Sequence, residues 1–302
     1  MDRVGRMTVE CAIRAEYARA LLRLIGRDPE GPLAMAFATV PRENFVGSPP
    51  WRVRGGSFGT GAETEDIADI YSDVLVSLDR EKTINNGSPS LHARALDKLS
   101  PAPGEKVVHI GAGTGYYSAI IAELVGSAGH VTAVECCDKL AARARAALKD
   151  YPNVDVIEAD GALYPLEDAD IVYVNFACDH PADAWVERLK PGGRLLFPLG
   201  IPVSVPGRQS RFSDMAAFLL VRREADGEFS AHFLTGVSFI WGEGPLWQSQ
   251  KRQGNLRLCF RARGLSTVKG LRWKSAAVGP EWYGEEHWGL TTAAPSGGHQ
   301  VR

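Results

Sequence analysis

Between residues 106 and 198, short β-branched segments alternate with segments of helical length, and this alternation limits the possible folds more than any other feature of the chain. It predicts strands over 107–110, 131–135, 154–158, 170–177 and 194–198, and helices over 116–125, 138–149 and 181–189. Strands joined by helices imply right-handed crossovers, so we expect a doubly wound α/β fold around a mostly parallel sheet. Residues 215–221 and 231–239 follow without an intervening helix, which predicts an antiparallel hairpin at one edge.

The segments on either side of this core follow other patterns. An amphipathic opening helix is predicted by apolar residues at helical spacing, namely Val9, Ile13, Tyr17, Leu21, Leu24 and Ile25. Residues 51–61 contain four glycines, which predicts a loop. We expect an N-terminal helical and loop segment over 1–80 packed on the core, a core domain over 81–245, and a C-terminal extension over 246–302.

Within the extension the periodicity fades, and the last dozen residues are expected to be disordered. The extension also contains four tryptophans, most of which we expect to pack as core, namely Trp247, Trp273, Trp282 and Trp288.

The overall charge of the chain argues against some classes of partner. A formal net charge of −2 gives no electrostatic basis for binding nucleic acid or an anionic membrane. The longest apolar run, residues 215–221, is too short to cross a bilayer, and the first ten residues lack the apolar centre of a secretory signal. The five cysteines form no C-x-x-C pair, which indicates reduced thiols in a cytoplasmic protein and predicts no metal site.

A glycine-rich segment, His-Ile-Gly-Ala-Gly-Thr-Gly-Tyr-Tyr-Ser over residues 109–118, lies between the first expected strand and the next helix. Glycines there let a ligand approach the backbone at the carboxyl end of a parallel strand, although a structural turn alone would also use them. A dinucleotide-binding fingerprint places its third glycine at position 116, but here that residue is Tyr116. The resulting G-x-G-x-G pattern resembles the first motif of S-adenosylmethionine-dependent methyltransferases. The resemblance implies cofactor contacts from Gly111, Ala112, Gly113, Thr114 and Gly115.

Acidic residues follow the next two expected strands. Glu135 comes 24 residues after Gly111, near the ~20-residue spacing of an acid that binds ribose hydroxyls. The alternative is a solvated glutamate at a strand end. In the methyltransferases that the glycine loop resembles, an acidic residue at the position of Asp160 meets the adenine amino group and Gly161 leaves room for the ring, whereas alone this pair is an ordinary turn. One position departs from that pattern, because the usual acid before the glycine loop is His109 here.

Several segments outside the glycine loop resemble protein-L-isoaspartate O-methyltransferases. They are Ala-Thr-Val-Pro-Arg-Glu-Asn-Phe-Val over 38–46, Thr-Ile over 83–84, Leu-His-Ala-Arg-Ala-Leu over 91–96, Lys-Pro-Gly-Gly within 189–200, and closing strands at 218–221 and 237–240. The resemblance runs from about residue 36 to about residue 244 and implies a Rossmann-like sheet with S-adenosylmethionine as cofactor. It also implies that Thr83, Ile84 and His92 lie near the cofactor.

The departures from this family gather where its substrate should bind. The family's Thr-Ile-Ser segment, whose serine contributes to the active site, has Asn85 in place of the serine. Ser88 restores a hydroxyl, but from a different backbone position. The small residues that follow the family's fourth strand become Asn-Phe-Ala-Cys-Asp-His over 175–180, and the connection over 200–214 is longer than usual. Altered substrate segments beside an intact glycine loop fit an activity directed at one dedicated peptide.

Methyl transfer from a sulfonium is an in-line displacement, so the enzyme mainly positions its reactants, which can contribute ~7–11 kcal/mol. A carboxylate acceptor is ionised at neutral pH and needs no general base. A hydroxyl or amine acceptor would gain from one. The candidate bases are His92, Asp179 and His180, beside the loop candidates Asn85 and Ser88. Since His180 precedes a proline, its alternative role is to shape a turn.

The leading hypothesis is a carboxyl O-methyltransferase that acts on an aspartyl or isoaspartyl group of a peptide or protein. Residues 85–92 are then expected to build the acceptor pocket; the alternative is a polar turn before the helix that begins near Leu91. The second hypothesis is an O- or N-methyltransferase of small molecules. The third is a non-catalytic, cofactor-binding adaptor, motivated by the missing serine and by the extension after residue 244.

Overall fold

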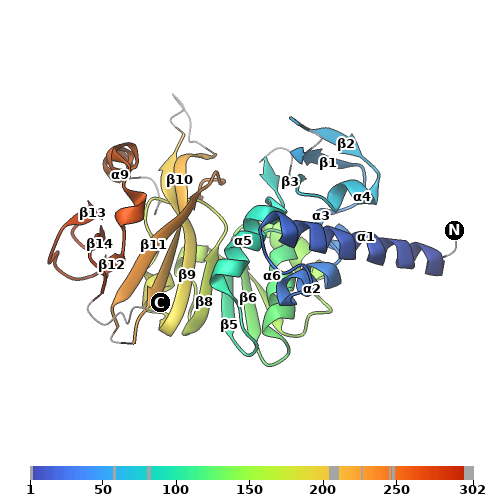
Figure 1. The fold of residues 1–302 in the computed structure, drawn as a ribbon, viewed down its shortest axis with the longest axis horizontal. Coiled ribbons are helices and arrows are strands. Elements are labelled where there is room, and N and C mark those ends of the chain that lie inside the picture. Colours follow the sequence, from blue (N-terminus) through green and yellow to red (C-terminus); the bar gives the residue numbers. More distant parts are fainter. Residues whose placement is uncertain are drawn as a thin grey trace. The chain divides into compact units, whose positions relative to one another are not determined.

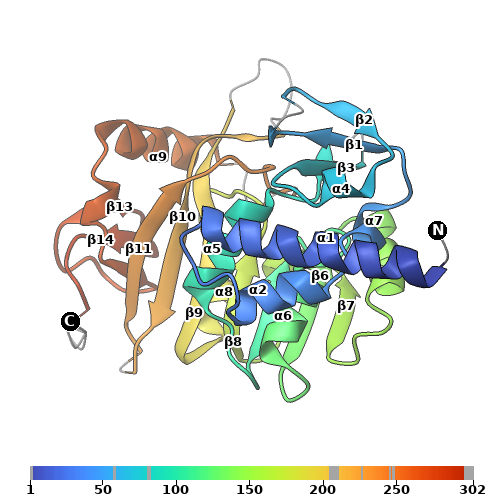
Figure 2. The same ribbon diagram turned by 45° about the vertical axis from the view of Figure 1, so that its right-hand side comes forward.

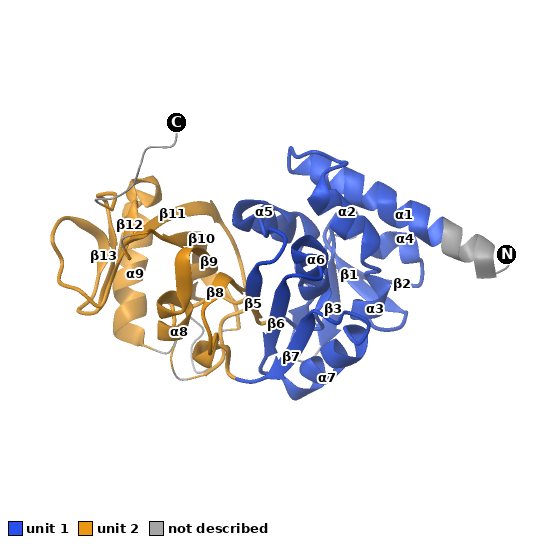
Figure 3. Cartoon of the chain, turned by 90° about the horizontal axis from the view of Figure 1, so that it is seen from below, with its two compact units in different colours: residues 1–107, 112–159 blue, residues 108–111, 160–302 orange. Residues whose placement is uncertain are grey.

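The computed structural model describes residues 3–56, 59–79, 83–203, 211–225, 227–244, 246 and 249–295. The chain divides into two compact units, coloured separately in Figure 3. The first comprises residues 1–107 and 112–159, and the second comprises residues 108–111 and 160–302. Strand β5 (Lys106–Ile110) contributes residues to both. The predicted three-part division at residues 80 and 245 stays a prediction.

The first unit opens with the predicted helix, α1 (Arg3–Leu24), although Val9 and Leu24 of its predicted apolar face are exposed. Its buried side chains recur three or four residues apart, and they are Tyr17, Ala18, Leu21 and Leu22. This face packs against α2 (Pro32–Thr39) and α5 (Pro89–Leu99), and Figures 1 and 2 both show α1 lying along α2. The helix stops before Gly26, whose φ of +71° is a conformation that glycine adopts readily.

A small antiparallel sheet of the first unit has the strand order β2-β1-β3-β4. Its elements and the helices near them are α3 (Glu43–Val46), β1 (Trp51–Arg54), β2 (Ala62–Thr64), α4 (Ile67–Ile70), β3 (Leu75–Asp79) and β4 (Ile84–Asn85). The prediction of a loop over 51–61 is therefore wrong at its start. Trp51 and Val53 are buried while Arg52 and Arg54 are exposed, so a two-residue alternation sets the strand before the first glycine of that segment.

The remaining elements of the first unit confirm the predicted α/β alternation. They are α6 (Tyr116–Val125), β6 (His130–Glu135), α7 (Asp138–Ala147) and β7 (Val154–Glu158). Strands β6 and β7 pair in parallel, from Val131 opposite Val154 to Glu135 opposite Glu158. Parallel pairing places the ends of the two strands at the same edge, where ligands of such sheets bind.

In the second unit the strands follow the order β13-β14-β12-β11-β10-β9-β8-β5. The elements between β5 and the extension are the short helix η2 (Gly161–Leu163), β8 (Ala169–Val174), α8 (Asp183–Glu187), β9 (Leu189–Pro202), β10 (Ser213–Arg223) and β11 (Phe229–Gly236). Strands β8 and β9 are parallel, whereas β9, β10 and β11 are antiparallel neighbours, which confirms the predicted hairpin. Its predicted place at the edge of the sheet is wrong, because strands of the C-terminal extension continue the sheet beyond β11. Strand β9 runs beyond the predicted 194–198 because its buried end, including Leu199 and Ile201, pairs with β10.

The C-terminal extension contains elements that the sequence pattern did not predict. They are α9 (Gln250–Ala262), η4 (Leu265–Thr267), β12 (Gly270–Trp273), β13 (Glu281–Gly284) and β14 (Trp288–Thr291). Strand β12 joins the sheet through the pairing of Ser230 with Gly270. Trp288 is buried as expected, Trp273 and Trp282 are partly exposed, and Trp247 lies outside the described residues. The expected disorder of the last dozen residues falls largely on 296–302, which are also outside them.

The pairings above confirm the predicted α/β class, with parallel strands, an antiparallel hairpin, an N-terminal helical segment and a C-terminal extension. Within the part of the chain that the structure describes, no helix is both long and apolar enough to span a membrane.

Candidate active site

The first unit carries most of the glycine loop. Gly113 and Gly115 have φ angles of +60° and +90°, a region that glycine enters without strain. Gly115 also caps α6, and a Cβ atom there would lie 2.5 Å from the side chain of Leu148. Close packing of α6 therefore requires the third glycine at this position, one residue earlier than in a dinucleotide fingerprint.

Glu135 lies against this loop. Its Oε2 accepts a hydrogen bond from the Gly113 N–H at 2.8 Å, and its Oε1 accepts one from the Cys137 N–H at 2.9 Å. The side chain is buried rather than solvated, with 7% of the residue exposed, and this burial raises the pKa of its carboxyl against the opposing effect of the hydrogen bonds. A carboxylate offers about four lone-pair sites. Glu135 thus retains acceptor capacity for ribose hydroxyls, and its contact with them stays a prediction.

A second feature of the glycine loop, the buried hydroxyl of Thr114, also suits the predicted cofactor. Thr114 is 2% exposed, and its Oγ1 has no hydrogen-bond partner among the described residues. A buried hydroxyl without a partner costs free energy, and native structures contain few of them. Beside two glycines whose backbone lacks a Cβ atom, such a hydroxyl can be satisfied by a polar atom of a bound nucleoside. Ala112 links the loop to β6 through its N–H, which donates to the Val134 carbonyl at 3.1 Å.

The second unit carries Gly111, Asp160 and Gly161. Gly111 has a φ of +73°, and a Cβ atom on it would lie 3.2 Å from the ring of Phe176. A Cβ atom on Gly161 would clash with Ile110, so packing against β5 already requires this glycine. Asp160 is exposed, and its Oδ1 accepts a hydrogen bond from the Ala162 N–H at 2.9 Å. Asp160 therefore caps η2, and its predicted contact with adenine stays a prediction.

His109, which replaces the usual acid, is fully buried in the second unit. Burial lowers the pKa of its imidazole to about 3, so the ring is neutral at pH 7. The ring stacks on Tyr173, with the centroids 5.4 Å apart, and its Nε2 lies 2.5 Å from Nδ2 of Asn175. The Asn175 Oδ1 is buried and has no hydrogen-bond partner among the described residues. The backbone N–H of Asn175 donates to the Ile110 carbonyl at 2.8 Å. Asn175 directly follows the buried strand β8, and no sequence motif singled it out.

The predicted acceptor loop lies in the first unit. Thr83 has a φ of +57° and is exposed, and Ile84 and Asn85 form β4. The Asn85 Oδ1 accepts a hydrogen bond from the Gly87 N–H at 2.8 Å, so this side chain shapes the turn. Such an interaction supports the turn interpretation for Asn85 without testing its contact with substrate.

The residues after that turn are held by Asp73 and Tyr117. The Ser88 Oγ donates to the Asp73 Oδ1 at 3.0 Å, and Ser90 donates to the same carboxylate through its N–H and its hydroxyl, at 2.9 and 2.6 Å. His92 is 3% exposed and stacks on Tyr117, with the ring centroids 3.7 Å apart. Gly87 has a φ of +77°, and a Cβ atom there would clash with the His92 ring. The first unit thus brings Asn85, Ser88 and His92 together around Gly87.

Arg42 is a buried residue whose role the sequence analysis missed. It belongs to the Val-Pro-Arg segment that carries the family resemblance, and its guanidinium is fully buried. Its Nε donates to the Asn86 Oδ1 at 3.1 Å, and its other nitrogens donate to the carbonyls of Ile70, Ser72 and Val74. Arg42 thus holds the side chain of Asn86, which adjoins Asn85 in the predicted acceptor loop.

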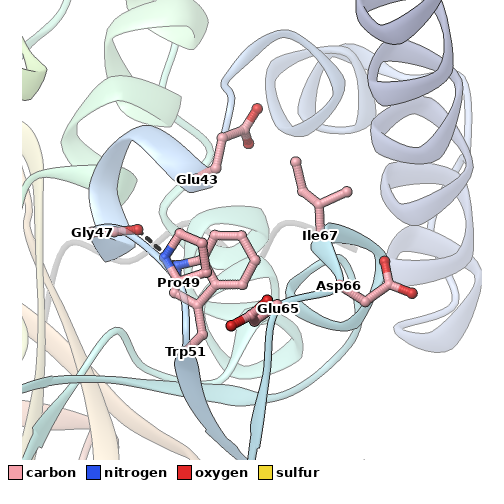
Figure 4. A pocket seen from close by; sticks show the side chains of 7 residues that line it. All are labelled: Glu43, Gly47, Pro49, Trp51, Glu65, Asp66 and Ile67. Carbon is pink, nitrogen blue, oxygen red and sulfur yellow. Dashed lines mark hydrogen bonds between the residues drawn. The ribbon is translucent and has the colours of Figure 1, made fainter. Parts of the chain in front are cut away.

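A pocket of about 470 Å³ opens elsewhere in the first unit, as Figure 4 shows. It is lined by Glu43, Gly47, Pro49, Trp51, Glu65, Asp66 and Ile67. The Trp51 Nε1 donates to the Gly47 carbonyl at 2.7 Å, and the Asp66 carboxylate caps α4. Glu43 binds the Tyr71 hydroxyl. Trp51, Asp66 and Glu43 therefore make hydrogen bonds within the fold. No sequence motif predicted the pocket.

Asp179 and His180 lie together in the second unit, after β8. The His180 Nδ1 lies 2.6 Å from the Asp179 Oδ1, and Asp179 is fully buried. Arg252 and Gln253 of α9 also donate hydrogen bonds to this carboxylate. The pair is therefore part of a buried polar network rather than a simple turn. Among the described residues, no three His, Cys, Asp or Glu side chains gather as they would around a metal ion.

The sequence is similar to one family of known proteins. The model of the protein-L-isoaspartate(D-aspartate) O-methyltransferase family matches residues 58–242, more than half of the chain. The protein-L-isoaspartate O-methyltransferase of Methanothermobacter thermautotrophicus is 30% identical over 209 residues, which cover 68% of this chain and 83% of the relative. The protein of the same name from Methanopyrus kandleri is 32% identical over 225 residues, covering 72% and 86%.

Solved structures agree on the fold. A protein-L-isoaspartate O-methyltransferase has a TM-score of 0.61 at 24% identity, covering 76% of this chain and 66% of its own. A putative enzyme of the same kind from Plasmodium falciparum, solved with S-adenosyl-L-homocysteine, has a TM-score of 0.58 at 15% identity, covering 76% and 98%. At these identities the likeness shows the fold alone.

The family match confirms the predicted class of enzyme, a methyltransferase that uses S-adenosylmethionine. The matched residues contain the whole glycine loop together with Glu135, Asp160 and the predicted acceptor loop. The chain belongs to the protein-L-isoaspartate(D-aspartate) O-methyltransferase family.

Proposed function

We propose that this protein transfers the methyl group of S-adenosylmethionine to the carboxylate of an isoaspartyl or aspartyl residue in a peptide or protein. The observation that carries the proposal is the contact between Glu135 and the Gly113 N–H, which joins the predicted ribose acid to the glycine loop. Membership of the family supports the carboxylate as acceptor.

In this reaction the main task of the protein is to position the two reactants. Bound S-adenosylmethionine supplies a methyl group activated as a sulfonium. An acceptor carboxylate is ionised at pH 7, so no side chain has to remove a proton. The residues of the glycine loop and Glu135 would hold the cofactor, and residues 85–92 would orient the acceptor. Holding acceptor oxygen and methyl carbon in line can lower the barrier by ~7–11 kcal/mol.

The substrate is proposed to be narrower than damaged protein in general. The glycine loop keeps the methyltransferase pattern, while Asn85 replaces the serine of the resembled segment and residues 175–180 carry larger and more polar side chains. A polar site discriminates strongly against ligands that lack its hydrogen-bonding partner. One dedicated peptide that carries an isoaspartyl group would fit these changes. A cytoplasmic location stays a prediction from the sequence.

A panel of matched peptides tests the proposal. Each sequence is made with isoaspartate, with aspartate and with asparagine at one position, and methyl incorporation from a labelled donor is measured. Turnover restricted to the carboxylate-bearing peptides is the expected result. A labelled small molecule from cell extract, with no label on any peptide or protein, would favour the small-molecule alternative. Cofactor binding without turnover on peptides or extract would favour the adaptor.

A further inference from the structure

The extension and the loop after β8 share a buried network of charged groups. Asp179 is fully buried, and its carboxylate lies 2.6 Å from the His180 Nδ1. Two residues of α9 complete its surroundings: the Gln253 Nε2 donates at 3.1 Å, and the Arg252 Nη1 lies 3.5 Å away as its cationic partner. Arg252 also reaches the His180 Nδ1 at 3.0 Å. A buried carboxylate is stable only when paired and hydrogen-bonded, so Asp179 depends on α9.

Arg252 is itself held in place from its other side. Its Nε lies 3.0 Å from both carboxylate oxygens of Glu285. The Tyr283 hydroxyl and the Trp288 Nε1 also donate to Glu285, at 2.6 and 3.3 Å. Although burial acts in the opposite direction, the hydrogen bonds from Tyr283 and Arg252 keep the pKa of Glu285 below its ordinary value. The guanidinium is thus fixed between two carboxylates.

The opposite end of the same loop reaches the glycine loop. Gly111 packs against Asn175 and Phe176 at the start of the loop. The middle of the loop is bound through its backbone. Ala177 donates to the Ile240 carbonyl at 2.8 Å, and Cys178 donates to the Pro198 carbonyl at 3.1 Å. Residues 175–180 therefore form a rigid connection between the first glycine of the loop and α9, all within the second unit.

The two sides of this network differ in their relation to the family match. Asp179 and His180 lie inside residues 58–242, which match the family model, whereas Arg252, Gln253 and Glu285 lie outside them. The network therefore joins a loop inside the matched region to a helix beyond it.

We propose that Arg252 is a positioning residue, through which α9 fixes residues 175–180 as an acceptor-binding segment of the second unit and makes the extension a determinant of substrate choice. This inference rests on the proposed function. It deepens that function by assigning specificity to a part of the chain beyond the family match. If the network served only to attach the extension to the sheet, weakening it would reduce stability and leave the acceptor kinetics unchanged.

The test compares Arg252→Ala with Arg257→Ala. Arg257 lies on the same helix and pairs with Asp214 at 2.8 Å, but it does not contact residues 175–180 in the part of the chain that the structure describes. Kinetics on an isoaspartyl peptide and calorimetry with S-adenosylhomocysteine are measured on folded variants. Arg252→Ala should lower kcat/KM by roughly 10- to 100-fold with unchanged cofactor affinity. Arg257→Ala should lower it by less than about threefold, because a half-exposed ion pair contributes little.

Arg252→Lys keeps the charge opposite Asp179 and should recover part of the lost kcat/KM, which a purely structural role would not predict. A folded Arg252→Ala variant with the kinetics of Arg257→Ala would overturn the inference, as would an equal loss of cofactor affinity. The proposed function is judged separately, by the wild-type protein alone. If the wild type methylates another acceptor, the same comparison is made with that acceptor, and the predicted difference between the two variants is the same.

Discussion

At the scale of single residues, His109 shows how a departure from a motif can be accommodated. The usual acid before the glycine loop is replaced by an imidazole that is fully buried and neutral, because burial lowers its pKa to about 3 from an ordinary value of 6.5. Asn175 lies beside it at hydrogen-bonding distance. The substitution therefore removes a negative charge without introducing a positive one.

This pKa predicts a pH dependence of stability. The unfolded chain binds a proton on His109 below pH 6.5, whereas the folded chain does so only near pH 3. Stability from this residue is therefore complete above pH 6.5 and is lost as the pH falls from 6.5 toward 3, at up to ~1.4 kcal/mol per pH unit. Urea unfolding of the wild type should show about 2 kcal/mol more loss between pH 6.5 and 5 than unfolding of His109→Phe, which cannot titrate. Equal losses in the two proteins would contradict the neutral, buried imidazole.

Glu135 provides a second test at this scale. Glu135→Ala should weaken binding of S-adenosylhomocysteine by roughly 1–3 kcal/mol in calorimetry, because the ribose hydroxyls lose a charged acceptor. Glu135→Gln is the matched control, since it keeps the shape and one acceptor oxygen, and it should lose less. Unchanged affinity in the alanine variant would show that the ribose lies elsewhere. NAD should not bind any of the three proteins.

At the scale of elements, the segment from β4 to α5 is expected to set the acceptor pocket. Asn85 and Ser88 bond within this segment and to Asp73, while Asn86 holds the buried Arg42. Replacing Asn85 and Ser88 together with alanine should lower turnover on an isoaspartyl peptide and leave cofactor affinity within a few-fold. Asn86→Ala is a contrasting variant: it should lower the free energy of unfolding by about 1–3 kcal/mol, because a buried cation loses an acceptor. Normal turnover in the folded double variant would show that Asn85 and Ser88 do not build the acceptor pocket.

The sequence predicts the bounds of some helices and strands closely and misses others. Helix α6 and strand β7 have the predicted bounds, and β6 differs by one residue, because strands rich in β-branched residues and apolar helices each have a recognisable local pattern. Strand β1 and the strands of the extension were missed. They are only four residues long, and β12 owes its place in the sheet to Ser230, far away in the sequence. Such strands depend on tertiary pairing more than on local preference.

At the scale of the whole molecule, local motifs predict contacts within one short region better than contacts between distant segments. Glycine spacing and a strand-end acid predicted Gly113 and Glu135, which the structure joins by a hydrogen bond. Arg42 and Arg252 could not be assigned in the same way, because their partners lie 28 to 44 and 33 to 73 residues away. A hydrogen bond or ion pair between distant segments leaves no periodic signal, so only the folded chain reveals it.

The most direct test of the central claim is the chemical nature of the transferred methyl group. The protein is incubated with an isoaspartyl peptide and a donor labelled in its methyl group, and the labelled peptide is then treated with mild base. A carboxyl methyl ester hydrolyses under these conditions, so the label should appear as volatile methanol. The matched asparaginyl peptide, which lacks the side-chain carboxylate, should release much less. Label that stays on the peptide after base treatment would show methylation of another group and would contradict the account.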